Sequence, residues 1–297
     1  MESNLLNEYE LITDSNNDPN DPVNKFVDYI DIPSYHMEQV PTNVSISTMS
    51  LAYNFGTLIN AKNIYKYMIL ESDNIVAVKS PEGIRCINEQ IKKKFKSTNK
   101  NSKKNFFNQN TIIMNITGER FTNIKLFKNG SIQMTGCKYL SDANIAINKL
   151  FNKLKEKLIV KTDNTEKEIT FVDEPEKLSV NKFKIDLINT NFGVSYLINK
   201  EKLFNILTNK GVLCRLSAIH SCVNIKYKII NEQDKYVSIF VFQTGNIIIT
   251  GAKKAEHIKE TYNYIVQFLN QNKQNIMKKD ISKILDANDF KEILGSS

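Results

Sequence analysis

The chain has 297 residues, of which 41% are hydrophobic and 24% are charged, and this composition excludes a wholly disordered, collagen-like or coiled-coil chain. No segment approaches the roughly 18 uninterrupted apolar residues of a membrane span, and the acidic, Asn-rich start lacks the features of a secretory signal. The net charge is +8, but the first 39 residues hold nine acidic side chains and one basic one, so the rest carries +16. This distribution fits a polyanion partner and equally a basic protein without one.

Cysteine and histidine usage indicates neither a metal site nor a disulfide framework. The four cysteines contain no C-x-x-C pair, and the three histidines are not spaced as metal ligands. These residues are Cys86, Cys137, Cys214, Cys222, His36, His220 and His257. We therefore expect free thiols in a reducing compartment, with no metal and no cofactor.

Polar segments divide the chain. Residues 1–39 predict an acidic, largely disordered arm. Residues 90–105 read "QIKKKFKSTNKNSKKN", a Lys-rich insertion that is interpreted either as a solvated loop or as a loop that contacts phosphate. Residues 161–180 are polar and predict a linker, and residues 275–297 predict a helical tail.

An internal repeat organises the remainder. Residues 126–138 read "LFKNGSIQMTGCK" and residues 241–253 read "VFQTGNIIITGAK", and the two segments align without a gap at an offset of 115. The identical pairs are Phe127/Phe242, Gly130/Gly245, Ile132/Ile247, Thr135/Thr250, Gly136/Gly251 and Lys138/Lys253. Self-similarity at a fixed offset indicates tandem copies, here residues 40–160 and 181–274.

Both copies predict the same order of elements. Each opens with a strand and a helix, at residues 43–70 and 183–210, and continues with three strands separated by turns rich in Gly, Asn and Asp. After each Thr-Gly, apolar residues recur at i, i+4, i+7 and i+11, the stripe of an amphipathic helix. The predicted fold class is therefore α+β, with an antiparallel sheet covered by helices on one side.

Strand alternation assigns the two faces of that sheet. Ile132, Met134, Ile247 and Ile249 are expected to face the helices. The outward rows are then Ser131, Gln133 and Thr135 in the first copy and Asn246, Ile248 and Thr250 in the second. Small hydroxyl, amide and aliphatic side chains suit the DNA minor groove at A·T pairs, which offers acceptors and no exocyclic donor.

The two hairpin-strand-helix blocks resemble the direct repeats of the TATA-box-binding protein family, which carry a Phe-x-x-Gly hairpin, a short strand ending in Thr-Gly-Ala-Lys and a long helix. The Lys- and Asn-rich character is most similar to members from large DNA viruses. The resemblance implies a saddle-shaped, curved antiparallel sheet with helices on its convex side. It also implies minor-groove binding with bending, a mode that this family itself exemplifies.

The resemblance also implies roles for individual residues. Phe127 and Phe242 match one intercalating wedge of each pair. Phe107, or its neighbour Phe106, matches the second wedge of the first copy, whereas the equivalent place in the second copy falls near Cys222. The residues expected on the groove face are Asn43, Gln133, Thr135, Asn189, Ile248 and Thr250, and Lys138 and Lys253 are expected near phosphate.

The predicted function is transcription initiation without catalysis, by a monomer that binds double-stranded DNA. The implied partners are a transcription factor IIB-like factor and the RNA polymerase machinery, at a site of transcription in a nucleus, a cytoplasmic viral factory or a virion, with no membrane and no secretion. The alternatives are an RNA-binding module and a nucleic-acid enzyme that uses the sheet as a substrate platform. The outward rows lack a mid-strand aromatic for stacking bases, and no catalytic motif is present.

Overall fold

The computed structural model describes residues 10–13, 26–95, 108–162, 165–217, 219 and 221–278. The chain folds as two compact units, unit 1 from Met1–His36 and Thr48–Ile188 and unit 2 from Met37–Ser47 and Asn189–Ser297. The chain crosses between the units three times. The first crossing follows His36, between two 3-10 turns, and the other two fall within β2 (Ser45–Asn54) and β10 (Asn181–Gly193). None of the described helices is long and apolar enough to cross a membrane.

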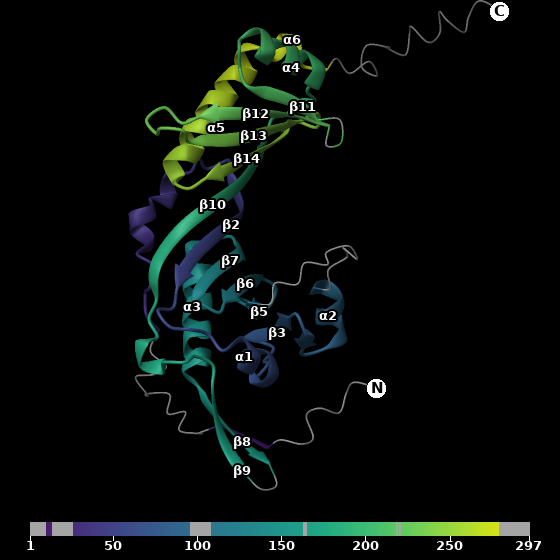
Figure 1. Ribbon diagram of the computed structural model, residues 1–297. Helices are drawn as coiled ribbons and strands as arrows, with labels where there is room; N and C mark the ends of the chain where they lie inside the picture. Colours follow the sequence, from purple (N-terminus) through teal and green to yellow (C-terminus); the bar gives the residue numbers. More distant parts are fainter. Residues whose placement is uncertain are drawn as a thin grey trace, which may run out of the picture. The chain divides into compact units, whose positions relative to one another are not determined.

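An antiparallel sheet with the strand order β2-β7-β6-β5-β3-β4 forms the body of unit 1 (Figure 1). The strands after β2 are β3 (Ile75–Ser80), β4 (Gly83–Cys86), β5 (Gln109–Asn115), β6 (Phe121–Phe127) and β7 (Ser131–Cys137). Helix α1 (Ala61–Tyr67) contacts β3 and β5, and α3 (Leu140–Lys155) contacts β7. Ile132 and Met134 are almost fully buried, so the predicted apolar face of the sheet is confirmed.

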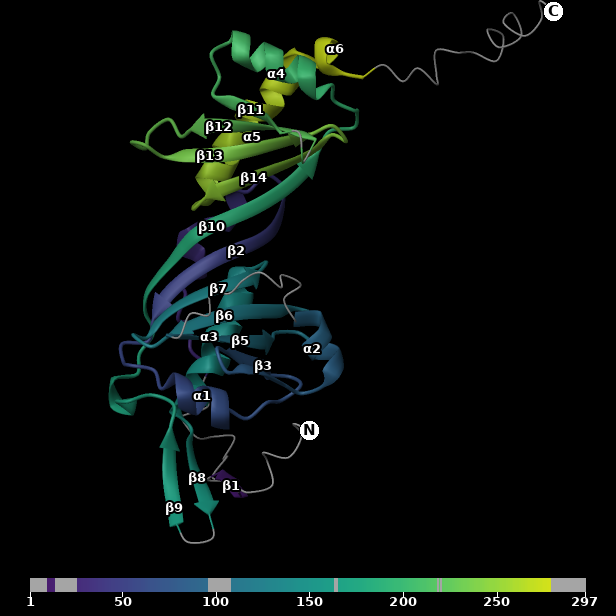
Figure 2. The ribbon, with the colours of Figure 1, turned by 45° about the vertical axis from the view of Figure 1, so that its right-hand side comes forward.

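The opposite face of the unit 1 sheet is partly covered at its outer end by α2 (Glu89–Phe95) and its flanking residues. In Figures 1 and 2, α2 lies beside β3 on the side away from α3. Together the sheet and this cover bury a small cluster made of Val76, Ala77, Cys86, Ile87, Ile91, Ile113 and Phe121. The cover includes the start of the Lys-rich insertion, and residues 96–107 lie outside the described part of the chain.

A second, three-stranded sheet in unit 1 has the order β1-β8-β9. It joins β1 (Glu10–Thr13) to the hairpin of β8 (Lys157–Thr162) and β9 (Thr165–Thr170), and a 3-10 turn follows at Pro175–Lys177. Ion pairs Lys157–Glu168 (3.0 Å) and Lys161–Glu166 (2.8 Å) cross the hairpin. The segment predicted as a linker therefore contains an ordered strand, and the predicted arm contributes β1.

The N-terminal segment 26–30, here called the strap, is held along α3 through its main chain. Asn148 accepts from the Val27 amide through Oδ1 and donates to the Val27 carbonyl through Nδ2, both at 2.8 Å. One turn earlier, Asn144 accepts from the Tyr29 amide (3.1 Å) and donates to the Asp28 carboxylate (2.9 Å). Both asparagines are buried beneath the strap, which satisfies polar groups that burial would otherwise penalise.

Unit 2 repeats the plan with the strand order β11-β12-β13-β14-β10. Its strands after β10 are β11 (Cys214–Ser217), β12 (Cys222–Lys228), β13 (Tyr236–Phe242) and β14 (Asn246–Ala252). Helix α5 (Ala255–Gln271) contacts β13 and β14, α4 (Lys200–Asn209) contacts β11 and β12, and α6 (Lys273–Ile276) contacts both helices (Figure 2). Ile247 and Ile249 are fully buried, as predicted.

Each unit has a glycine in its hairpin, and these two glycines, Gly130 and Gly245, are one of the identical pairs of the repeat. Gly130 and Gly245 have φ of +79° and +88°, a region that favours glycine. A Cβ on Gly245 would lie 2.7 Å from the Val194 carbonyl oxygen, and one on Gly130 would collide with the Thr57 carbonyl. The loop after each opening strand therefore packs directly onto the hairpin, which fixes both in place.

We expect Asn148→Ala to lower the free energy of unfolding by about 1–3 kcal/mol, because it leaves the Val27 amide and carbonyl without their partner. Asn263 is the matched control, since it occupies the equivalent place on α5 but is exposed, and Asn263→Ala should change stability by less than about 0.5 kcal/mol. Urea unfolding gives the energies, and hydrogen exchange at the Val27 amide reports the strap. Equal stability of the two variants with unchanged exchange at Val27 would contradict the assignment.

Candidate nucleic-acid interface

Each sheet presents a second face, here called the open face, opposite its closing helix α3 or α5. The strand registers place matching rows on the two open faces. In unit 1 the rows run over β6 and β7 as Asn123–Thr135 and Lys125–Gln133, and in unit 2 over β13 and β14 as Ser238–Thr250 and Phe240–Ile248. These side chains are half-buried or exposed, so the predicted outward rows are confirmed as a surface.

The two repeat phenylalanines lie at the ends of their hairpin strands, on the open faces. Phe127 pairs across the strands with Gln109, and Phe242 pairs with Cys222. Cys222 is 1% exposed, and burial raises the pKa of its thiol, so it is a neutral, small neighbour of Phe242. The register makes Gln109 the first-copy equivalent of Cys222, while Phe106 and Phe107 lie outside the described residues.

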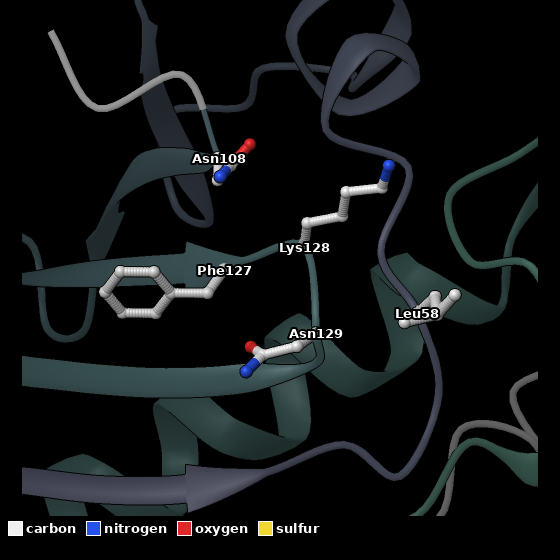
Figure 3. Close-up of a pocket in the computed structure, with 5 residues that line it drawn as sticks. All are labelled: Leu58, Asn108, Phe127, Lys128 and Asn129. Atoms are coloured by element: carbon white, nitrogen blue, oxygen red, sulfur yellow. The ribbon is translucent and has the colours of Figure 1, made fainter.

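A hollow of about 460 Å³ adjoins the Phe127 hairpin. Figure 3 shows Phe127, Lys128 and Asn129 of the β6–β7 hairpin on one side, with Leu58 and Asn108 approaching from other loops. Leu58 is 47% exposed, and Leu197, which holds the equivalent place in unit 2, is 50% exposed. An exposed aliphatic side chain therefore lies in the loop after the opening strand of each unit, and sequence reasoning had not identified either one.

An amide and a hydroxyl contact each other on β10 and β14, the last two strands in the order of unit 2. Thr250 donates its hydroxyl to Oδ1 of Asn189, so the donor that Asn189 presents is its Nδ2. Two residues further along β10, Asn191 donates to the Ser47 hydroxyl at 3.0 Å. The structure thus brings together Asn189 and Thr250, which the sequence analysis assigned to the groove face separately, and it adds Asn191, which the two-residue strand period could have indicated.

Equivalent main-chain hydrogen bonds identify the corresponding residues of unit 1. The Phe55 amide donates to the Gly130 carbonyl (2.9 Å) just as the Val194 amide donates to the Gly245 carbonyl (3.0 Å). Counting back along β2, Ser50 corresponds to Asn189, and it pairs with Thr135. The position beside the strand-end threonine therefore carries the Ser50 hydroxyl in unit 1 and the Asn189 amide in unit 2.

Asn43 does not join these rows. It precedes β2 and donates through Nδ2 to the hydroxyl of Tyr262 at 2.6 Å. Tyr262 belongs to α5, the helix that closes unit 2 on the side away from the open face. The structure thus gives Asn43 a contact with a helix, and the opening strand supplies Ser50 where an amide was expected.

The middle rows differ most between the units. Lys125 and Gln133 occupy the row in unit 1, and Phe240 and Ile248 occupy it in unit 2. The expectation that no aromatic lies in mid-strand on the outward rows is wrong, because Phe240 lies there between Asn224 and Ile248. Extending the alternation back by two residues from Phe242 would have found it.

The lysines after each Thr-Gly stand exposed at the start of the closing helices. Lys138 and Lys253 are held there by their main chains, since the Lys138 amide donates to Asp142 (3.3 Å) and the Lys253 amide donates to Nδ1 of His257 (3.2 Å). Their ammonium groups therefore extend from a fixed backbone, as a phosphate contact requires.

Side-chain contacts join each of these helix starts to the turn two strands earlier. Asp142 pairs with Arg120 at 2.9 Å in unit 1, and His257, its equivalent at the offset of 115, contacts Glu232 at 2.8 Å in unit 2. Hydrogen bonds from His257 and Lys254 lower the pKa of Glu232 to about 2, so its carboxylate stays charged at neutral pH. Both units therefore have this contact, but the acidic residue is on the helix in unit 1 (Asp142) and on the turn in unit 2 (Glu232).

Within the described part of the chain, no group of three or more His, Cys, Asp or Glu side chains could hold a metal ion. The open faces offer hydrogen-bond donors and apolar side chains, and Lys138 and Lys253 are exposed at the starts of the closing helices.

Comparisons with known proteins find one family model, a viral relative and a solved structure that are similar to this chain. The family model described as "Transcription factor TFIID (or TATA-binding protein, TBP)" matches residues 216–272. A TATA-box-binding protein-like protein of Acanthamoeba polyphaga mimivirus is 38% identical over 266 residues, which cover 81% of this chain and 71% of the relative. The structure of Methanococcus jannaschii TBP aligns with 77% of this chain and 99% of its own, with a TM-score of 0.47 and 18% identity. The chain belongs to the TATA-box-binding protein family, a family of DNA-binding transcription factors.

Proposed function

We propose that this protein is a transcription initiation factor that binds A·T-rich, TATA-like duplex DNA in the minor groove and bends it, without catalysis. The observation that carries the proposal is the matched pair of open faces. Each places a phenylalanine at a hairpin end and a threonine at the end of the adjoining strand. Two copies of the same surface suit two stretches of the same groove.

Hydrogen-bond chemistry supports the minor groove at A·T pairs. Adenine N3 and thymine O2 are acceptors, and the open faces offer donors such as Nδ2 of Asn189 and the Ser50 hydroxyl. Apolar Ile248 and Phe240 suit a groove floor that presents no exocyclic amino group. Phe127 and Phe242 are then the wedges that unstack base steps, with Leu58 and Leu197 beside them.

Electrostatics supports a backbone contact. The chain outside its first 39 residues carries a charge of +16, and most of its basic residues are lysines, which act as point charges for phosphate. Lys138 and Lys253 lie at equivalent places. The partners proposed on this basis are double-stranded DNA, a transcription factor IIB-like factor and the RNA polymerase machinery, with one protein molecule on each site.

A second candidate is favoured by one observation. Phe240 offers an aromatic ring in mid-strand on the open face of unit 2, and stacking on such rings is how sheets bind single-stranded nucleic acid. Binding measured side by side on duplex A·T DNA, its separated strands and matched RNA decides between them, since the main proposal expects the duplex to be preferred.

Phe127→Ala and Phe242→Ala should each reduce the bend of an A·T-rich duplex, because the substitution removes an apolar wedge. Fluorescence energy transfer between dyes on the two DNA ends measures the bend. Phe204→Ala is the control, because Phe204 is a half-buried phenylalanine on α4. A bend that both wedge variants leave unchanged would remove these residues from the mechanism.

Binding should weaken with salt, with a slope of log K against log [salt] of about −0.9 for every phosphate contacted. Lys138→Gln and Lys253→Gln should each make that slope shallower by about 1 and weaken binding evenly across sequences. Lys202→Gln, at an exposed place on α4, should leave the slope unchanged. If the slope is the same in all three variants, Lys138 and Lys253 do not contact phosphate.

A further inference from the structure

The side chains in the middle row of unit 1 can form hydrogen bonds, whereas those in the middle row of unit 2 cannot. In unit 1, Lys125 and Gln133 are directly paired across β6 and β7. The Lys125 ammonium group is a hydrogen-bond donor, and the Gln133 amide has both donors and an acceptor. In unit 2, the equivalent pair is Phe240 and Ile248 across β13 and β14, and neither side chain has a polar atom. All four side chains are exposed or half-buried.

The base that tests this difference is guanine. In the minor groove, a G·C pair differs from an A·T pair by the exocyclic N2 amino group, which is a donor. Against Gln133, that amino group meets an amide oxygen that can accept from it. Against Phe240 and Ile248, it is buried without an acceptor, which is the costly case for a polar group.

We propose that the open face of unit 2 requires A·T pairs beneath it, whereas the open face of unit 1 accepts G·C pairs as well. The inference rests on the proposed function, since it assumes that each open face contacts its own stretch of the minor groove. The residues that set the difference are Phe240 and Ile248 in unit 2, with Lys125 and Gln133 as the permissive pair in unit 1.

The asymmetry has a consequence for a palindromic target. On such a site, the protein can bind in either direction, so a G·C pair in one half is accommodated by turning unit 1 toward it. G·C pairs in both halves leave unit 2 facing guanine in either direction. One substituted half should therefore be tolerated wherever it lies, and two substituted halves should not.

Four duplexes test this with the full chain. They share a palindromic A·T core between two different flanking sequences, which make its left and right halves distinguishable, and they carry G·C substitutions in neither half, the left half, the right half or both. Wild-type protein should bind the first three within about threefold of one another. It should bind the fourth roughly 5- to 150-fold more weakly, the range typical for a mismatched base pair. Equal binding to all four, or equal losses with one and two substituted halves, would overturn the inference.

Exchanging the rows provides the decisive variants. Phe240→Lys with Ile248→Gln should make all four duplexes equivalent. Lys125→Phe with Gln133→Ile should make one substituted half cost the roughly 5- to 150-fold that wild-type protein loses only when both halves are substituted, and should make the doubly substituted duplex weaker still. Lys259→Gln with Asn263→Gln, on the exposed surface of α5, is the matched double control and should keep the wild-type pattern. If the row-exchange variants keep the wild-type binding pattern, these four residues do not set the preference and the inference is wrong. If wild-type protein does not bind the unsubstituted duplex, the proposed function itself is wrong.

Discussion

The burial of aliphatic side chains beneath each closing helix decides which residues the other face of the sheet can present. In β14, Ile247 and Ile249 are fully buried against the helix side, so Ile248 and Thr250 must point the other way. Because the side-chain period of a strand is two, a slip of one residue would exchange these sets and place apolar core residues in solvent. The hydrophobic core thus determines which side chains the candidate interface presents. The close approach of the opening loop at Gly130 and Gly245 holds the hairpins that carry Phe127 and Phe242.

The two units keep this skeleton and differ on their surfaces. The same main-chain hydrogen bonds join the opening loop to the hairpin in both units, and a side-chain contact joins each helix start to a turn, Asp142 with Arg120 in unit 1 and His257 with Glu232 in unit 2. Around that skeleton, unit 1 has gained the α2 cover and the strap along α3, whereas unit 2 has gained an apolar middle row. The two open faces therefore share one skeleton and differ in the side chains that they present.

Much of the fold could be predicted from the sequence because the two aligned segments had to form the same elements, so each interpretation was tested twice. The hairpin strands β6, β7, β13 and β14, the helices α3 and α5 and the orientation of the outward rows follow from the aligned segments and from strand alternation. The polarity of residues 161–180 hid β9, because the strand reads Thr-Glu-Lys-Glu-Ile-Thr and has Ile169 as its one apolar side chain, which pairs with the buried Leu158 of β8. Asn43 could not be placed from sequence, since its contact with Tyr262 joins residues far apart in the chain. Phe240 was missed because the alternation was followed along only one strand of the hairpin.

The central claim is that the open faces bind the minor groove of an A·T-rich duplex. Methylation protection with dimethyl sulfate tests it directly, since this reagent modifies adenine N3 in the minor groove and guanine N7 in the major groove. With the full chain bound to an A·T core flanked by G·C pairs, the account predicts protection of adenine N3 across the core while guanine N7 in the flanks stays reactive. Protection of guanine N7 with adenine N3 left reactive would place the protein on the other side of the duplex and contradict it.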